Sequence, residues 1–209
     1  MRLGNNTRVR ALIVACVCAL HACTTGPIRD EASMHSMRDA HNDAPVDPFR
    51  GDAGSLVAFV FVSHECPIAN AMMPDIRALA RSARERGVAF YAVHPAHWVD
   101  EQTVRKHSVD FALAPDAVVL RDPSQVLTRA LGATITPEAA LIRLRGDGTF
   151  ERLYLGRFSD LYAGIGRRKA SATTHDFSDA IASALAGELV HSPQEKAIGC
   201  FIELQPQSR

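Results

Sequence analysis

The hydrophobic positions of this chain predict buried strands alternating with amphipathic helices from residue 56 onwards. Leu56–Val62 is a continuous apolar run rich in Val and Phe, which is typical of a strand covered on both faces. Apolar positions then recur at helical spacing from Met72 to Ala83, and Val88–Val93 forms a second buried run. A helix between two such strands predicts a parallel pair joined by a crossover connection.

The second half of the chain predicts further helices and a hairpin. A polar helix is expected around Asp100–His107, and Asp122-Pro123 predicts the start of another helix, with Pro at its first position. Ala139–Leu144 and Phe150–Leu155 flank a Gly-rich turn, which predicts a β-hairpin. The clearest helical pattern, Phe177–Leu185, comes last. The order β–α–β–α–α–β–β–α indicates a mixed α/β sheet with helices on both faces.

Residues 1–22 have the layout of a secretory signal peptide. Three arginines and no acidic residue precede the apolar run Ala11–Leu20, which is too short to cross a bilayer. The run ends in Leu-His-Ala-Cys, which resembles a bacterial lipobox, so Cys23 is the predicted site of lipidation. His21 departs from that motif, where a small residue is usual. The alternative interpretation is a buried first helix of the domain.

The segment after this signal predicts a tether. Residues 23–50 lack apolar periodicity and contain three prolines, so we expect a flexible link to a domain over residues 51–204, followed by a tail over 205–209. The predicted location is the periplasmic side of the cell envelope. Because Thr24 and not Asp follows Cys23, resemblance to the lipoprotein sorting rule points to the outer membrane in a cell with two membranes.

Composition narrows the class of protein. The 209 residues include 23 Lys plus Arg, 23 Asp plus Glu and 47% hydrophobic residues, which suits one globular domain with a real core. The balanced charge argues against a charge-driven disordered chain. It also argues against nucleic acid as the main partner, because phosphate binding needs a clear surplus of basic residues.

Cysteine usage isolates two thiols. Of the five cysteines, Cys16 and Cys18 lie in the predicted signal and Cys23 at the predicted lipid anchor, which leaves Cys66 and Cys200 in the domain. Disulfides persist in exported proteins, so these two residues are candidates for a redox pair.

Cys66 lies where a reactive thiol is expected. It follows the first buried strand, and Pro67 then opens the next helix, at the position where no backbone N–H is needed. The helix dipole and the unpaired N–H groups at a helix start stabilise a thiolate, which predicts a nucleophile toward disulfides or peroxides. The alternative is a buried, inert cysteine that packs as a small apolar residue.

The sequence resembles the thioredoxin fold. More closely, it is similar to redoxins of the alkyl hydroperoxide reductase/thiol-specific antioxidant family over about residues 50–204. The resemblance rests on Phe61–Pro67, Cys66–Asn70, Thr136-Pro137, Gly156–Tyr162 and Gly199-Cys200. It implies that Cys66 is the redox centre, that the Thr136–Pro137 bond is cis and faces it, and that Pro137 shapes the substrate groove.

Two departures from these families bear on the activity. Ala69 stands where a thioredoxin has its second cysteine, and Phe59 stands where the peroxiredoxin motif Pro-x-x-x-Thr-x-x-Cys has its proline. Ser63 replaces the threonine of that motif and is expected to hydrogen-bond the sulfur. Neither the two-cysteine disulfide cycle of a thioredoxin nor standard peroxidase activity is therefore implied.

The predicted function is an exported thiol-dependent redox protein that acts on a disulfide-bearing protein or a peroxide, without a cofactor or metal. Cys200 is the expected partner of Cys66. The alternative is that Ala197–Leu204 forms a short terminal strand in which Cys200 only packs, and that an external thiol resolves Cys66. Two further hypotheses stay open. One is a copper-handling protein of similar fold that uses Cys66 with a histidine, and the other is a non-catalytic docking module.

Overall fold

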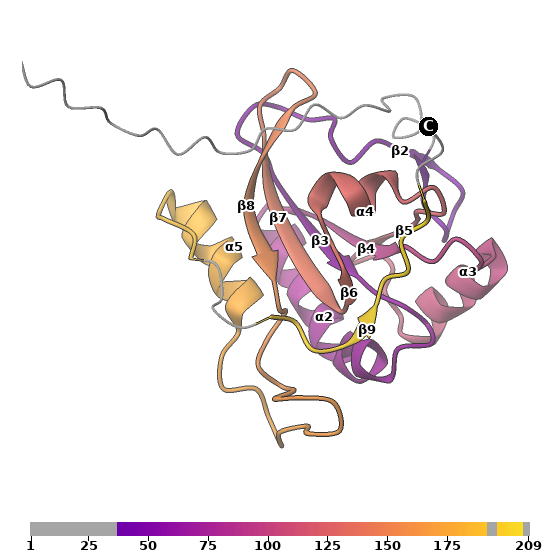
Figure 1. Cartoon of the computed structure of the whole chain (residues 1–209). Coiled ribbons are helices and arrows are strands. Elements are labelled where there is room, and N and C mark those ends of the chain that lie inside the picture. Colours follow the sequence, from indigo (N-terminus) through magenta and orange to yellow (C-terminus); the bar gives the residue numbers. More distant parts are fainter. Residues whose placement is uncertain (1–36, 192–195, 207–209) are drawn as a thin grey trace, which may run out of the picture.

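A computed structural model describes residues 37–191 and 196–206. Its centre is a five-stranded sheet in the order β5-β4-β3-β7-β8 (Figure 1). Strand β3 runs parallel to β4, and β4 parallel to β5, whereas β7 and β8 are antiparallel to their neighbours. The strands are β3 (Leu56–Phe61), β4 (Ala89–His94), β5 (Val118–Arg121), β7 (Glu138–Leu144) and β8 (Phe150–Gly156).

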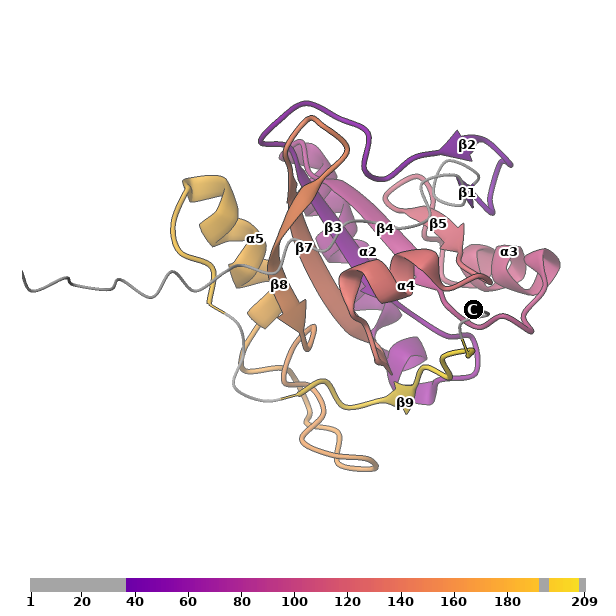
Figure 2. The same cartoon turned by 45° about the horizontal axis from the view of Figure 1, so that its top comes forward.

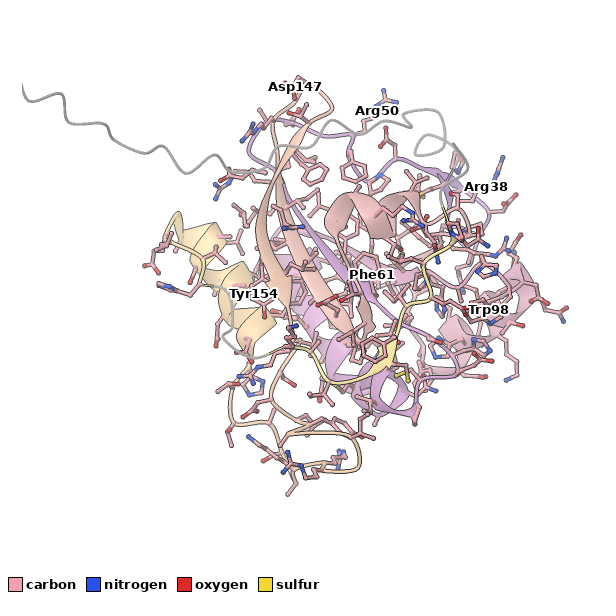
Figure 3. All side chains as sticks on the ribbon, viewed as in Figure 1. Arg38, Arg50, Phe61, Trp98, Asp147 and Tyr154 are labelled. Atoms are coloured by element: carbon pink, nitrogen blue, oxygen red, sulfur yellow. The ribbon has the colours of Figure 1, made fainter. Side chains whose placement is uncertain are left out.

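Helices cover both faces of this sheet. The helices α2 (Pro67–Glu85), α3 (Glu101–Asp110) and α5 (Asp176–Ala186) contribute to one apolar cluster, and α4 (Val126–Leu131) contributes to another. Alternate residues of β3 divide between the two clusters, with Ala58 and Val60 facing α2, and Phe59 and Phe61 facing α4. Figure 3 shows Phe61 near the middle of the molecule. Burial on both faces explains why β3 is a continuous apolar run.

This architecture is thioredoxin-like, and the predicted fold class is confirmed. One strand of the central sheet was not predicted. Val118–Arg121 is only four residues long and is too short for a periodic signal, yet it pairs in parallel with β4. Helix α4 also begins later than expected, at Val126. The Asp122 side chain accepts a hydrogen bond from the Thr128 N–H at 2.8 Å, within the first turn of the helix.

The expected tether is wrong for its second half. Residues 37–50 form a small hairpin of β1 (Met37–Arg38) and β2 (Pro45–Val46) that packs on the α4 side of the domain. Met37 and Phe49 are each 6% exposed, and the Phe49 ring lies 5.1 Å from that of Phe150. Single buried side chains such as these leave no periodic pattern in the sequence. The predicted signal, Cys23 and the first part of the tether lie outside the described residues.

The C-terminal segment returns to the domain and pairs with a short strand near the start of α2 (Figure 1). Strand β9 (Cys200–Phe201) pairs antiparallel with β6 (Ile135–Thr136), so that Cys200 lies opposite Thr136. Figures 1 and 2 both show the segment passing the start of α2 on its way from the α5 side toward α3. None of the helices in the described part of the chain has the length and apolarity needed to cross a membrane.

Candidate redox site

Cys66 caps the N-terminus of α2 with its own sulfur. Its backbone is extended, Pro67 occupies the first turn, and Sγ accepts a hydrogen bond from the Ala69 N–H at 3.4 Å. As a thiol, the group donates to the Thr136 carbonyl oxygen at 3.0 Å. Strand β3 delivers Cys66 to this point, and the residue is fully buried. The predicted position at a helix start is therefore present in the structure.

Cys200 is the second thiol of the site. The β6–β9 pairing places it across from Thr136, the residue whose carbonyl contacts the Cys66 sulfur. The two cysteines are free rather than bridged, and both line the same pocket. The sequence left two alternatives, proximity of the two thiols and a terminal strand over Ala197–Leu204 in which Cys200 only packs. The strand covers only Cys200–Phe201, and Cys200 is exposed on it and lines the same pocket as Cys66.

The two thiols differ in acidity. Burial opposes ionisation of Cys66, but hydrogen bonds from the Ala69 N–H, the Cys200 thiol and the Thr136 hydroxyl outweigh it and lower its pKa. The pKa of Cys200 is raised to about 11 by burial, by its hydrogen bond to Cys66, and by the negative charges of Cys66 and Glu65. Cys66 is therefore the thiol that ionises first.

A pocket of about 190 Å³ opens beside the two sulfurs. Its walls are mostly apolar and include the side chains of Trp98 and Phe201, which are 51% and 86% exposed. Figure 3 shows Trp98 on the α3 side of β9. Glu65 and Glu203 also line the pocket. An apolar pocket with a few polar groups suits a ligand that is largely non-polar next to its reacting atom.

The other predicted residues have mixed outcomes. The Thr136–Pro137 bond is cis, as expected, and Thr136 lines the pocket. Pro137 is buried and borders a separate small cavity with Met72. The expected bond from Ser63 to the sulfur is not what the structure shows. The Ser63 hydroxyl accepts from the Glu65 N–H at 3.3 Å, while the Ser63 carbonyl accepts from the Cys66 N–H at 3.1 Å, which fixes the loop before α2.

Histidines gather behind the start of α2. The rings of His94 and His107 meet edge to face with centroids 5.0 Å apart, and His107 Nε2 lies 2.8 Å from the Asn70 amide oxygen. The Asn70 amide nitrogen in turn donates to the His64 carbonyl at 2.8 Å. Among the described residues, no group of three or more His, Cys, Asp or Glu side chains is arranged to hold a metal ion. The cluster thus supports the loop that carries Cys66.

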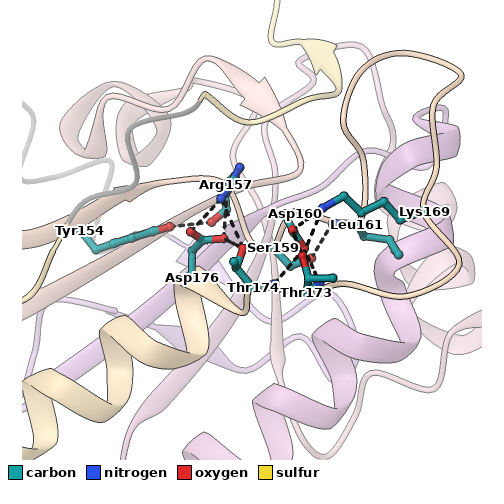
Figure 4. Close-up of polar contacts among 9 residues, drawn as sticks. All are labelled: Tyr154, Arg157, Ser159, Asp160, Leu161, Lys169, Thr173, Thr174 and Asp176. Atoms are coloured by element: carbon teal, nitrogen blue, oxygen red, sulfur yellow. Dashed lines mark hydrogen bonds and ion pairs between the residues drawn. The ribbon is translucent and has the colours of Figure 1, made fainter.

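The loop between β8 and α5 is braced on the far side of Pro137. Asp160 accepts hydrogen bonds from the Lys169 ammonium, from the Thr173 hydroxyl and N–H, and from the Thr174 N–H (Figure 4). Arg157 forms an ion pair with Asp176 at the start of α5, with a shortest distance of 2.9 Å. These contacts hold Phe158 and Ser159 against the small cavity that Pro137 borders.

Sequence reasoning missed one buried residue near the site. Gln125 is fully buried, and its side-chain amide contacts the backbone at Pro95, Glu203 and Gln205. A lone glutamine before a short helix has no periodic or motif signal, so nothing in the sequence marked it.

Comparison with known proteins supports the fold. No model of a protein family matches the chain, and no curated protein sequence does. An uncharacterized conserved protein from Geobacillus kaustophilus superposes with a TM-score of 0.67 and 18% identity, over 83% of this chain and 89% of that one. A hypothetical protein from Sinorhizobium meliloti gives a TM-score of 0.61 and 21% identity, over 74% and 82%. A secreted disulfide oxidoreductase of Mycobacterium tuberculosis, homologous to E. coli DsbE, gives a weaker TM-score of 0.47 and 16% identity, over 75% and 98%.

Proposed function

We propose that this protein is a thiol–disulfide oxidoreductase in which Cys66 is the nucleophile and Cys200 the resolving thiol. The observation that carries the proposal is the pairing of β9 with β6, which places Cys200 opposite Thr136, the residue whose carbonyl contacts the Cys66 sulfur at the N-terminus of α2. A sulfur that caps a helix N-terminus and has a second thiol beside it has the components of a two-step exchange.

The exchange conserves atoms and electrons. The Cys66 thiolate attacks one sulfur of a substrate disulfide, forms a mixed disulfide, and releases the other substrate sulfur as a thiolate. Cys200 then loses its proton to solvent and attacks the Cys66 sulfur, which releases the second substrate thiol. The substrate gains two electrons, and the protein is left with a Cys66–Cys200 disulfide. An external dithiol returns the protein to its reduced form.

The difference between the pKa values of the two thiols explains why Cys66 attacks before Cys200. Two of the causes that raise the pKa of Cys200 are its hydrogen bond to Cys66 and the negative charge of Cys66. Both end when Cys66 enters a mixed disulfide, so the pKa of Cys200 falls at the moment when this thiol has to attack. Before that step, Cys200 stays protonated and stabilises the Cys66 thiolate.

The lining of the pocket favours a disulfide over a peroxide. Peroxide reduction expels hydroxide, which positive charge or hydrogen-bond donors would stabilise. The described residues that line the pocket include two acidic residues, Glu65 and Glu203, and no lysine or arginine. Phe59, at the position of the peroxiredoxin proline, is an ordinary strand residue paired with both β4 and β7. Trp98 and Phe201 instead offer apolar contact to a polypeptide.

We also infer that the protein is an exported redoxin related to the alkyl hydroperoxide reductase/thiol-specific antioxidant family. The sequence of residues 1–22 supports export, and Cys23 supports a lipid anchor at the periplasmic face of a membrane. Production in a bacterium with active lipoprotein processing tests this inference. Intact mass should correspond to a chain that begins at an acylated Cys23, and Cys23→Ser should abolish acylation. Retention of Met1 would contradict it.

Redox assays on matched variants test the proposed activity. The reduced protein should reduce a protein disulfide such as that of insulin and yield a Cys66–Cys200 cross-linked peptide. Cys66→Ser should be inactive, and Cys200→Ser should stop at a mixed disulfide. Hydrogen peroxide, given to the same proteins, should be turned over much more slowly than the protein disulfide. Alkylation of Cys66 no faster than that of a model peptide would refute the proposal and favour a docking module.

A further inference from the structure

The segment that carries Cys200 is bound along its length to the domain. We call residues 199–205 the strap. The Ile202 N–H donates to the Thr134 carbonyl at 2.8 Å, and the Ile202 side chain packs on the α4-side core. At the start of the strap, the backbone of Gly199 passes so close to β6 that an added Cβ would lie 1.9 Å from the Thr136 carbonyl oxygen. Only glycine permits this approach.

Gln125 holds the other end of the strap. Its amide nitrogen donates to the Glu203 carbonyl at 2.7 Å and to the Pro95 carbonyl at 3.1 Å. Its amide oxygen accepts from the Gln205 N–H at 2.8 Å. Arg129 adds a hydrogen bond to the Gln205 carbonyl. The Gln125 amide therefore satisfies both of its donor hydrogens and its acceptor on main-chain groups.

The backbone of Gln125 is unusual as well. Its φ is 57°, in the left-handed region that residues other than glycine rarely adopt, and the side chain is fully buried. Burial of a polar amide at such a position costs free energy unless hydrogen bonds compensate for it. Two of its bonds reach the strap and a third reaches Pro95, a residue of the pocket wall. The amide thus links the strap to the wall of the redox site.

We propose that Gln125 is a positioning residue that clamps the strap and so holds the Cys200 thiol against Cys66. This proposal rests on the proposed function and adds the residue that sets the rate of its second step. Attack of Cys200 on the mixed disulfide is fast only if the strap is held in register with β6, because a displacement of about 1 Å costs up to about a hundredfold in rate. The first step is an attack by Cys66, so the clamp acts on it only through access to the Cys66 sulfur and through the pKa of Cys66.

The strap also covers the nucleophile. Cys66 is fully buried, and Cys200 and Phe201 lie beside it in the same pocket wall. A large substrate therefore reaches the Cys66 sulfur only when the strap moves aside. Loosening the clamp should speed entry of a bulky reagent while it slows resolution, and a general loss of structure would not separate the two steps in this way.

Dithiobis(nitrobenzoate) resolves the two steps in one experiment. Attack by Cys66 releases one nitrothiolate, and attack by Cys200 on the mixed disulfide releases a second and leaves the Cys66–Cys200 disulfide. All proteins are full chains with Cys16, Cys18 and Cys23 replaced by serine, so that only the two site thiols react. Trp98, the only tryptophan in the chain, lines the pocket and gives a fluorescence signal for each phase.

Two variants release the strap from opposite ends. Gln125→Asn keeps an amide and tolerates the left-handed backbone, but its side chain is one methylene too short to reach the strap. Gly199→Ala leaves Gln125 intact and pushes the strap off Thr136. At a pH at which Cys66 is ionised in every protein, we expect both variants to show an unchanged or faster first release and a second release slowed at least about tenfold. The pKa of Cys66, followed by alkylation rate against pH, should rise as its bond to Cys200 is lost. Gln102→Asn, an exposed glutamine of α3, is the matched control.

The outcomes separate the two proposals. The clamp is supported if the wild type releases two nitrothiolates and both variants release the second one more slowly than the wild type. Two releases at wild-type rates in Gln125→Asn would overturn the clamp and leave the proposed function standing. A single release from the wild type, with no Cys66–Cys200 disulfide, would overturn the redox pair and the clamp with it.

Discussion

Acidification should destabilise this protein through the buried histidines behind the redox site. His94 lies at the end of β4 and is 1% exposed, and its Nε2 is buried without a hydrogen-bond partner. Burial, followed by repulsion from His107 and His64, lowers its pKa to about 3. Burial and His64 lower the pKa of His107 to about 4, against a smaller opposing effect of Asp110. Both rings are neutral in the fold at neutral pH.

The sign and size of the effect follow from proton linkage. An unfolded histidine titrates near its ordinary pKa of 6.5, so between that pH and the lower pKa of the fold the unfolded chain binds more protons. Stability is therefore complete above about pH 6.5 and is lost as the pH falls toward 3. At about pH 5, the pH lies roughly 1.5 below the pKa of His94 in the unfolded chain. Protonation of His94 therefore stabilises the unfolded chain by about 2 kcal/mol relative to the fold.

Urea unfolding at about pH 7 and about pH 5 measures this loss. The free energy of unfolding of His94→Gln should fall by about 2 kcal/mol less than that of the wild type, because glutamine does not titrate. Asp122 and Glu138, whose pKa values burial raises, contribute with the opposite sign in both proteins and cancel in the comparison. His41→Gln, at an exposed position, is the control. Equal pH dependence in His94→Gln and the wild type would refute the reasoning.

Three further changes probe other parts of the fold. Cys200→Ala should raise the pKa of Cys66, because a hydrogen bond that stabilises the thiolate is lost, and ultraviolet titration of the thiolate measures it. Asp160→Ala should lower the free energy of unfolding by about 2 kcal/mol, since several donors lose a charged acceptor, and an unchanged urea midpoint would contradict the brace. Phe49→Ala should cost about 3 kcal/mol in the same assay if residues 37–50 belong to the domain, whereas a tether would tolerate it.

The elements with long apolar patterns were predictable from the sequence. Strand β3 is buried on both faces, and α2 and α5 each present one apolar stripe, so local residue order carries their structure. Strand β5 was not predictable, because its four residues gain their stability from pairing with β4 and not from a local preference. The same holds for residues 37–50, where single side chains such as Phe49 reach the core between prolines and polar residues.

The same distinction between local and long-range contacts applies to the two cysteines of the candidate site. The position of Cys66 follows from a strand, a proline and a helix that are adjacent in sequence. The position of Cys200 depends on contacts between segments more than 60 residues apart, such as the Thr136 hydroxyl bond to the Cys200 carbonyl at 3.4 Å. Several of these contacts join main-chain groups, which every residue carries, and the others are made by the side chains of Thr136, Gln125 and Arg129. Sequence reasoning therefore placed Cys66 at the start of a helix and left the position of Cys200 between two alternatives.

The hairpin before β3 has a consequence for solubility. Strands β5 and β8 form the two edges of the sheet, and an open edge can recruit a strand from another molecule. At β5, the Ala40 N–H donates to the Val119 carbonyl at 2.8 Å, and Asp39 forms an antiparallel bridge with Leu120. A chain cut back to residue 51 would expose this apolar edge and should self-associate through it. The segment whose composition resembles a linker thus keeps one side of the sheet closed to other molecules.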